Sequence, residues 1–98
     1  MNLFKEPVGF EWDAGNKSKN WVKHRVTNEE CEEVFFDLHK RILNIEPQEG
    51  LEKRYLLLGR TKGQRYLFVV FTIRGYRVRV ISARDLNKKE RALYEKET

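Results

Sequence analysis

The sequence predicts an α+β fold in which helices pack on one face of an antiparallel β-sheet. Two segments with helical signals precede residue 40, and another follows residue 87. Between them lie four apolar segments that are typical of strands, and short turns join the last three. Short turns connect antiparallel neighbours, so the predicted order is β-α-α-β-β-β-β-α. A chain of 98 residues has the length of one domain, and we expect a single domain over residues 1–98.

The first part of the chain predicts a short strand and two helices. Residues 8–12 alternate weakly between apolar and polar side chains, as a short strand does. Asp13 has the side chain of an N-cap, and a polar helix is expected from there to about His24. Thr27 and Glu30 have the spacing of a capping box that starts a second helix. The core-facing side of that helix is expected to carry Cys31, Val34, Phe35 and Leu38.

The remaining strands and the last helix follow from apolar runs and turn residues. Strands are expected over residues 41–46, 54–59, 65–73 and 76–83, with a turn over residues 47–50. The strand at 65–73 is apolar on both faces, so we expect it at the centre of the sheet, covered at least in part on both sides. Asn87 is expected to cap a final helix over residues 88–97.

The charged residues are distributed unevenly, and the net charge is +5. Residues 29–52 hold eight acidic and two basic side chains, whereas residues 60–91 hold ten basic and two acidic ones. Such an imbalance suggests a surface that faces a polyanion, although a solvated basic face that aids solubility is the simpler alternative. For any single arginine, pairing with an acidic neighbour is the better explanation. For the whole set, pairing with acidic neighbours is not a sufficient explanation, because residues 60–91 contain ten basic side chains and only two acidic ones.

Several classes of protein have little support in the sequence. Cys31 is the only cysteine, so neither an internal disulfide nor a cysteine zinc site is expected, and no paired histidine spacing suggests a metal site. We therefore expect no metal and no cofactor. No signal peptide is visible, and no apolar run reaches the roughly 18 residues that a membrane span needs. A cytoplasmic protein without a membrane partner is expected.

The last predicted strand places arginines on the sheet face that the helices leave open. Val78, Val80 and Ser82 share one face and are expected to meet the helices, whereas Arg77 and Arg79 share the other. The arginines at nearby strand ends and turns are Arg60, Arg65, Arg74 and Arg84. The tyrosines available for stacking are expected to be Tyr66, Tyr76 and Tyr94. Cations that hold phosphates and rings that stack on unpaired bases are typical of a surface that binds single-stranded RNA.

The start of the last helix has basic side chains where the helix dipole favours acidic ones. Lys88 and Lys89 lie in the first turn, where each opposes the dipole by about 0.3–1 kcal/mol. Together with the free backbone N–H groups there, they favour a bound phosphate. Glu90 lies three residues after Asn87, so it fits a capping box, and it also fits a general base held ionised by neighbouring cations. From position alone, capping is the better supported role.

Several motifs resemble the BrnT family of ribonuclease toxins. The first is "FEWDAGNKSKNWVKHRVTNEECEEVF", in which "KH" follows "WD" eleven residues on. The others are "EKRYLLLG", "LFVVFT" and "RVRVISAR" followed by "ERALYE", so that the resemblance covers about residues 8–97. Two positions depart from the family pattern, because Arg25 stands where the family usually has glycine and Asn28 replaces a usual aromatic residue. Glycine ends helices in the left-handed conformation at little cost, so strain is expected at Arg25.

The resemblance implies a fold similar to RelE-type toxins, a metal-independent endoribonuclease that arrests translation, and a cognate antitoxin that silences it. It also implies that operator DNA is reached only through the antitoxin complex. The implied catalytic residues are Arg84, Glu90, Arg91 and Tyr94. The basic side chains expected to bind RNA are Arg60, Arg65, Arg74, Arg77, Arg79, Lys88 and Lys89. In the expected chemistry, Glu90 or a lysine deprotonates the ribose 2′-OH, arginines stabilise the phosphorus oxygens, and a cationic group or Tyr94 assists the leaving 5′-oxygen.

Two other functions fit parts of the sequence. Three strands followed by a helix with basic residues at its start also fit a non-catalytic RNA-binding module similar to double-stranded RNA-binding domains, although those domains begin with a helix. The other alternative is a small interaction protein whose basic face docks an acidic partner and binds RNA negligibly at physiological salt. Cleavage of RNA separates the ribonuclease from both.

Overall fold

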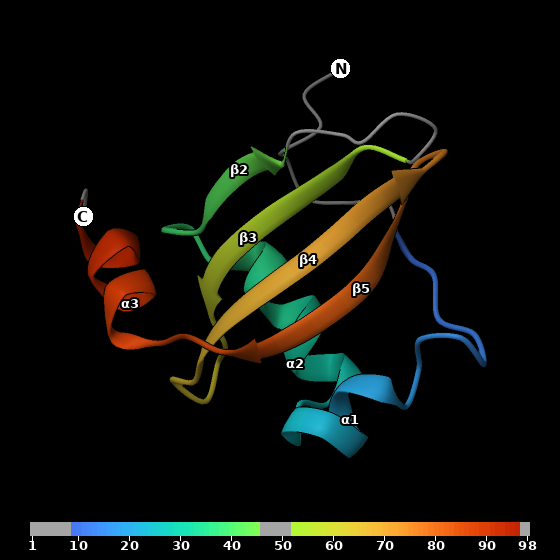
Figure 1. Ribbon diagram of the computed structural model, residues 1–98, viewed down its shortest axis with the longest axis horizontal. Helices are drawn as coiled ribbons and strands as arrows, with labels where there is room; N and C mark the ends of the chain where they lie inside the picture. Colours follow the sequence, from blue (N-terminus) through green and yellow to red (C-terminus); the bar gives the residue numbers. More distant parts are fainter. Residues whose placement is uncertain (1–8, 46–51, 97–98) are drawn as a thin grey trace.

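The computed structural model describes residues 9–45 and 52–96, and its elements follow the expected order (Figure 1). The first half contains β1 (Gly9–Phe10), α1 (Lys19–His24), α2 (Asn28–Glu33) and the short 3-10 helix η1 (Val34–Phe36). The second half contains β2 (Arg41–Ile45), β3 (Arg54–Arg60), β4 (Tyr66–Arg74), β5 (Arg77–Asp85) and α3 (Lys88–Glu95). The predicted α+β class is confirmed, whereas the turn expected over residues 47–50 lies outside the described residues.

The strands form one sheet in the order β1-β5-β4-β3-β2. β2, β3, β4 and β5 pair as antiparallel neighbours, which the short turns predicted for β3, β4 and β5, and β4 lies at the centre. β1 instead pairs in parallel with β5, with Gly9 opposite Arg77 and Phe10 opposite Val78. The sheet is therefore mixed rather than wholly antiparallel, because the first and last strands of the chain lie side by side and run in the same direction.

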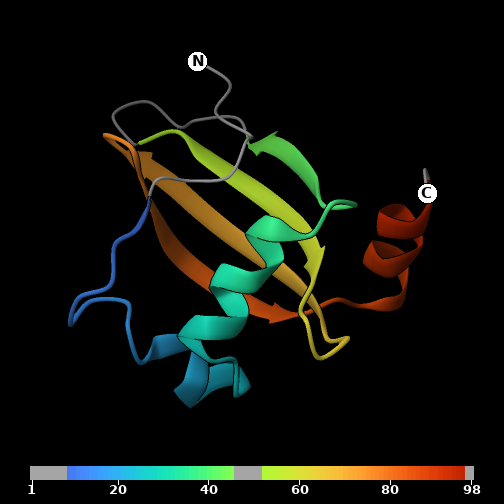
Figure 2. The same ribbon diagram turned by 180° about the vertical axis from the view of Figure 1, so that it is seen from behind.

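α1 and α2 cover one face of the sheet, and the core lies between them and the strands (Figure 1, Figure 2). The Phe35 ring of η1 lies edge-on to Phe71 of β4 and to Phe10, with ring centroids 4.9 and 5.3 Å apart. The positions predicted to face this core, and found buried, are Cys31, Val34 and Phe35. The same prediction is wrong for Leu38, which is 91% exposed because η1 ends at Phe36, so the helical spacing that would place Leu38 on the core side no longer applies.

The helix expected to start at Asp13 begins six residues later, with α1. The Asp13 carboxylate accepts a hydrogen bond from the Gly15 N–H at 2.8 Å, so the chain forms a turn there. The buried Asn16 side chain accepts from the Asp13 N–H at 2.8 Å and donates to the carbonyl oxygens of Glu11 and Val80. Side chains that satisfy the backbone in this way compete with helix formation, which explains the late start of α1.

The corner between α1 and α2 has both features that the sequence indicated. Thr27 and Glu30 form a complete capping box, in which Thr27 Oγ1 accepts from the Glu30 N–H at 3.0 Å and Glu30 Oε1 accepts from the Thr27 N–H at 2.9 Å. Arg25 ends α1 in the left-handed conformation, with a φ of 55°. That conformation is unfavourable for a side chain with a Cβ atom, so the expected strain at Arg25 is present.

A β-bulge in β5 decides which side chains face away from α1 and α2. Val70 of β4 pairs with Ser82, whereas its neighbour Phe71 pairs with Val80, so β5 contains one extra residue at this point. Beyond the bulge the alternation of faces shifts by one, and the expectation that Ser82 shares the valine face is wrong. The shift moves Arg84 onto the open face, by which we mean the face of the sheet opposite α1 and α2.

Candidate functional site

The open face carries cationic side chains where the ends of β3, β4 and β5 meet α3. We call Arg60, Arg84 and Arg91, which come from β3, β5 and α3, the arginine cluster. In the sheet, Arg60 lies opposite Tyr66 and Arg84 lies opposite Phe68. Cross-strand partners share a face, so the bulge in β5 is what brings Arg84 to the side of the sheet that carries Arg60. The structure thus gathers three of the residues that the sequence singled out.

Arg84 and Glu90 form a bidentate salt bridge. Arg84 Nη1 donates to Glu90 Oε1 at 2.8 Å, and Arg84 Nη2 donates to Glu90 Oε2 at 2.7 Å. Glu90 Oε1 also accepts from the Asn87 N–H at 3.0 Å, while Asn87 Oδ1 accepts from the Glu90 N–H at 2.8 Å. The capping role of Glu90 is thus confirmed, and the same carboxylate holds the arginine. The hydrogen bonds from Arg84 lower the pKa of Glu90, because they favour its ionised form.

Two aromatic rings of β4 lie against the arginine cluster. The guanidinium carbon of Arg84 lies 3.8 Å from the centroid of the Phe68 ring, and that of Arg91 lies 4.0 Å from the centroid of Tyr66. The guanidinium carbon of Arg60 is more distant from the Tyr66 centroid, at 5.8 Å. These are cation–π contacts. Arg91 therefore occupies a face of the Tyr66 ring that the sequence analysis had left available for a nucleobase.

Tyr94 of α3 is buried and is not exposed beside the arginine cluster. Its hydroxyl donates to Asp37 Oδ2 at 2.6 Å, and the residue is only 5% exposed. The same carboxylate oxygen accepts the backbone N–H of Arg60 at 2.9 Å, so Asp37 joins α3 to the end of β3. Burial raises the pKa of the Tyr94 hydroxyl, and the hydrogen bond to Asp37 raises this pKa further. Sequence analysis missed Asp37, because no local pattern connects a carboxylate after η1 with a helix 57 residues later.

Some cations of the predicted RNA-binding set are exposed and unpaired within the part of the chain that the structure describes. Lys88 and Lys89 lie in the first turn of α3, and neither forms an ion pair with a described carboxylate. Arg77 on β5 is likewise exposed and has no such partner. Arg91 has one loose partner, since its Nε lies 3.6 Å from Glu95 Oε2 and both side chains are about half exposed. These side chains leave positive charge available to an anion from solvent.

Arg74 and Arg79, at the other end of the open face, are neutralised by acidic side chains. Arg79 Nη1 donates to Glu11 Oε1 at 2.9 Å and to Asp13 Oδ2 at 2.7 Å. Arg74 Nη2 donates to Glu52 Oε1 at 2.8 Å. These carboxylates come from outside the basic segment, so a count along the sequence did not reveal them. The positive charge of the open face is therefore concentrated toward α3 and not spread evenly over the sheet.

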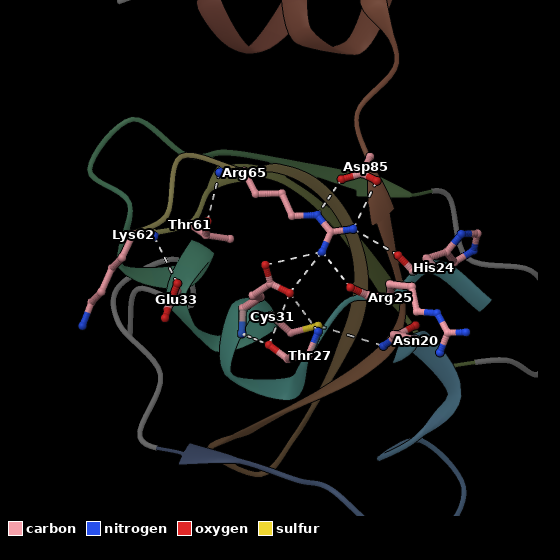
Figure 3. A network of polar contacts seen from close by, with 11 residues as sticks. Asn20, His24, Arg25, Thr27, Cys31, Glu33, Thr61, Lys62, Arg65 and Asp85 are labelled. Atoms are coloured by element: carbon pink, nitrogen blue, oxygen red, sulfur yellow. Dashed lines mark hydrogen bonds and ion pairs between the residues drawn. The ribbon is translucent and has the colours of Figure 1, made fainter. Parts of the chain in front are cut away.

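Arg65 lies at the centre of a polar network that Figure 3 shows from close by. Its Nε and Nη2 donate to the Asp85 carboxylate at 2.7 and 3.2 Å, and its Nη1 donates to Glu30 Oε1 at 3.1 Å. Nη1 and Nη2 also donate to the backbone carbonyl oxygens of Arg25 and His24, at 2.7 and 3.0 Å. An arginine has five N–H groups, and each of them has a partner here. Arg65 thus links the end of β5 to the corner between α1 and α2.

Within residues 9–45 and 52–96, no three histidine, cysteine, aspartate or glutamate side chains gather where they can hold a metal ion. No helix in these ranges is long and apolar enough to cross a bilayer.

Comparison with known families decides which kind of protein this is. A family model described as the ribonuclease toxin BrnT of a type II toxin–antitoxin system matches residues 12–90. The chain belongs to the BrnT family. The toxins of this family are ribonucleases of type II systems, so RNA is the target and an antitoxin is the partner. A search of curated proteins finds no match to the chain.

The matched part of the BrnT chain includes most of the arginine cluster. It extends far enough to contain Arg60, Arg84 and Glu90, together with Tyr66 and Phe68 of β4. The rest of α3 lies beyond the match, including Arg91 and Tyr94. The pair formed by Arg84 and Glu90 is therefore the part of the site that both the geometry and the family match include.

Proposed function

We propose that this BrnT chain is a metal-independent endoribonuclease that cleaves RNA through attack of the ribose 2′-OH, arrests translation, and is neutralised by a cognate antitoxin. The observation that carries the proposal is the position of Arg84, which Glu90 and Phe68 hold on the open face beside exposed cations at the start of α3. A guanidinium stays charged and holds phosphate oxygens through paired hydrogen bonds. The expected target is RNA, because the toxins of the BrnT family are ribonucleases.

In the proposed reaction, the scissile phosphate binds to Arg84 and Arg91. The 2′-oxygen attacks phosphorus, so that the bond between phosphorus and the 2′-oxygen forms while the bond to the 5′-oxygen breaks. The two arginines donate to the non-bridging oxygens, where negative charge grows in the transition state. The products are a 2′,3′-cyclic phosphate and a free 5′-hydroxyl. DNA lacks the 2′-OH and is not cleaved.

Glu90 is the proposed base, and its two carboxylate oxygens have different sets of partners. Oε1 accepts from both Arg84 Nη1 and the Asn87 N–H and stays in the helix cap, whereas Oε2 accepts from Arg84 Nη2. When the phosphate takes over the hydrogen bonds of Arg84, Oε2 becomes free to accept the 2′-OH proton. The pKa of Glu90 rises at the same time, because the guanidinium that lowered it now faces the phosphate. Substrate binding thus makes the carboxylate a stronger base.

The proton for the leaving 5′-oxygen comes in this proposal from a lysine at the start of α3. Lys88 and Lys89 are exposed there, next to Glu90 in the sequence. The Tyr94 hydroxyl is poorly placed for this step, since it is buried and already donates to Asp37. The guanidinium groups supply the positive charge that a metal ion would otherwise bring to the phosphate, which is why we propose cleavage without a metal.

Neutralisation by the antitoxin follows from the same geometry. A partner that covers the arginine cluster keeps RNA from the phosphate-binding groups, and acidic side chains suit this surface best. The complex reaches operator DNA only through the antitoxin in this proposal, because the cations of the toxin are then covered. The toxin would act in the cytoplasm, where messenger RNA is translated.

The test combines growth with cleavage by purified protein. The parent, Arg84→Ala and Glu90→Gln are expressed from a tightly repressed promoter, and single-stranded RNA is incubated with each purified protein in EDTA. We expect the parent alone to arrest growth and to produce 2′,3′-cyclic phosphate ends. Growth without arrest, together with RNA that is bound but uncut, would instead identify a binding module. Full activity of Glu90→Gln would remove Glu90 as the base and leave it as a cap.

A further inference from the structure

The arginine cluster lies on a stripe of aromatic side chains that its catalytic chemistry does not use. Tyr66 and Phe68 are two residues apart on β4, so both rings lie on the open face. Each ring meets a guanidinium from another element: Arg84 of β5 lies over Phe68, and Arg91 of α3 lies over Tyr66. Neither ring belongs to the hydrophobic core under α1 and α2, to which β4 contributes Leu67, Val69 and Phe71.

The contact between Arg84 and Phe68 is close enough to restrict the movement of the guanidinium. The guanidinium carbon lies over the ring, 3.8 Å from its centroid, which is within van der Waals contact. The ring therefore closes one face of the guanidinium. The N–H groups of Arg84 remain in the guanidinium plane, where Nη1 and Nη2 reach Glu90 at 2.8 and 2.7 Å.

The ring matters most at the moment when Arg84 exchanges partners. In the resting protein both Glu90 and Phe68 hold the side chain. When a phosphate takes the N–H groups, the ion pair with Glu90 is lost, but the ring contact remains because a phosphate does not compete for an aromatic face. We propose that Phe68 is a positioning residue of the ribonuclease. Its ring keeps the guanidinium of Arg84 in one orientation while the hydrogen bonds of that group change from Glu90 to the scissile phosphate. This inference rests on the function proposed above.

The first experiment measures single-turnover cleavage of a fluorescent single-stranded RNA that the parent cuts, in EDTA, for the parent, Phe68→Leu and Phe68→Tyr. Leucine keeps apolar bulk but removes the flat ring, so the cleavage rate constant should fall about tenfold or more. The dissociation constant of an uncleavable RNA with 2′-deoxyribose at the cut should change much less, because the charges remain. Tyrosine restores the ring, and its rate should return close to that of the parent.

A matched variant controls for general loosening of β4. Val70 is the next residue of β4 on the open face, opposite Ser82, and its aliphatic side chain has no ring on which a guanidinium can stack. Val70→Ala should cleave RNA like the parent. A Phe68→Leu protein that cleaves at the rate of the parent would overturn the positioning role alone, while a parent protein that leaves RNA intact would overturn the proposed function itself.

A second measurement uses only the parent and does not depend on the folding of any variant. The Phe68 ring should shift the Nε–H proton resonance of Arg84 upfield, and the uncleavable RNA should leave that ring shift in place while it perturbs Glu90. Loss of the ring shift on RNA binding would show that Arg84 leaves Phe68 together with Glu90, which contradicts the proposal.

Discussion

The Tyr94 hydroxyl donates a hydrogen bond of 2.6 Å to Asp37 Oδ2, and this contact joins the last helix to the segment that precedes β2. The same oxygen accepts the backbone N–H of Arg60 at 2.9 Å. Arg41 provides a second link, because its Nη1 donates to the Leu93 carbonyl oxygen near the end of α3 at 2.7 Å. α3 also carries Arg91 of the arginine cluster and Glu90, which pairs with Arg84. These links therefore fix the position from which the helix presents its part of the site.

Removal of the Tyr94 hydroxyl tests whether this residue anchors α3 or takes part in catalysis. In Tyr94→Phe the half-buried Asp37 loses a donor, so we expect the free energy of unfolding to fall by about 1–3 kcal/mol. Single-turnover RNA cleavage should stay close to the parent rate, whereas loss of a general acid would reduce it by about 100-fold or more. Urea denaturation and the cleavage assay measure the two quantities. Tyr76→Phe, at an exposed tyrosine, should change neither.

Replacement of Arg65 tests whether its network is structural. Arg65→Ala leaves the carboxylates of Glu30 and Asp85 and two carbonyl oxygens without their donor, so unfolding should become easier by about 2–3 kcal/mol. Arg77→Ala is the matched control, because this arginine is exposed and has no described carboxylate partner, and its effect should stay within about 0.5 kcal/mol. Equal effects of the two substitutions in urea denaturation would contradict the structural role of Arg65.

Local signals in the sequence were sufficient for the strands and for the caps of α2 and α3, although they placed the start of α1 too early. The capping boxes at Thr27 and Asn87 depend on residues three positions apart, and the strands depend on alternation over a few residues. Such features are fixed by neighbours in the chain, so they can be recognised without knowledge of the fold. The strain at Arg25 was expected instead from the resemblance to the BrnT family, which usually has glycine at this position, and Arg25 has the left-handed φ that such a glycine adopts.

Contacts between distant parts of the chain were not predictable in the same way. The bulge in β5 shifted Arg84 to the open face, although strict alternation placed Ser82 with the valines. The carboxylates that neutralise Arg79 come from Glu11 and Asp13, which follow β1 and meet β5 only in the folded sheet. The sequence therefore indicated a basic surface near the correct elements, but only the fold shows which arginines remain available to RNA.

Acid should destabilise the protein through the carboxylates that arginines hold ionised. Arg84 lowers the pKa of Glu90 below its ordinary value of 4.5, so the pair stabilises the folded state above that value and loses this contribution as the pH falls through the lower folded-state pKa. Asp85 contributes to the pH dependence of stability in the same direction, because Arg65 lowers its pKa. Urea denaturation should show a steady free energy of unfolding near neutral pH and a decline below about pH 4.5.

Glu90→Gln separates the contribution of the Arg84 pair from that of the other carboxylates. The amide can still accept the Asn87 N–H but cannot titrate, so the acid-induced decline should be shallower than in the parent. A decline in Glu90→Gln that matches the parent at every pH would mean that Arg84 contributes nothing through this pair.

Arg25→Gly tests the strain at the end of α1. Glycine adopts a φ of 55° without the Cβ clash, and the Arg25 carbonyl oxygen that Arg65 binds is kept, so we expect the free energy of unfolding to rise by about 0.5–1 kcal/mol. Lys23→Gly, two residues earlier in a helical conformation, should lower it by about 1 kcal/mol instead. Opposite signs for the same new residue in urea denaturation would assign the effect to the backbone conformation. If Arg25→Gly also lowered stability, the guanidinium 5.2 Å from the Trp21 ring centroid would have to contribute more than the strain costs.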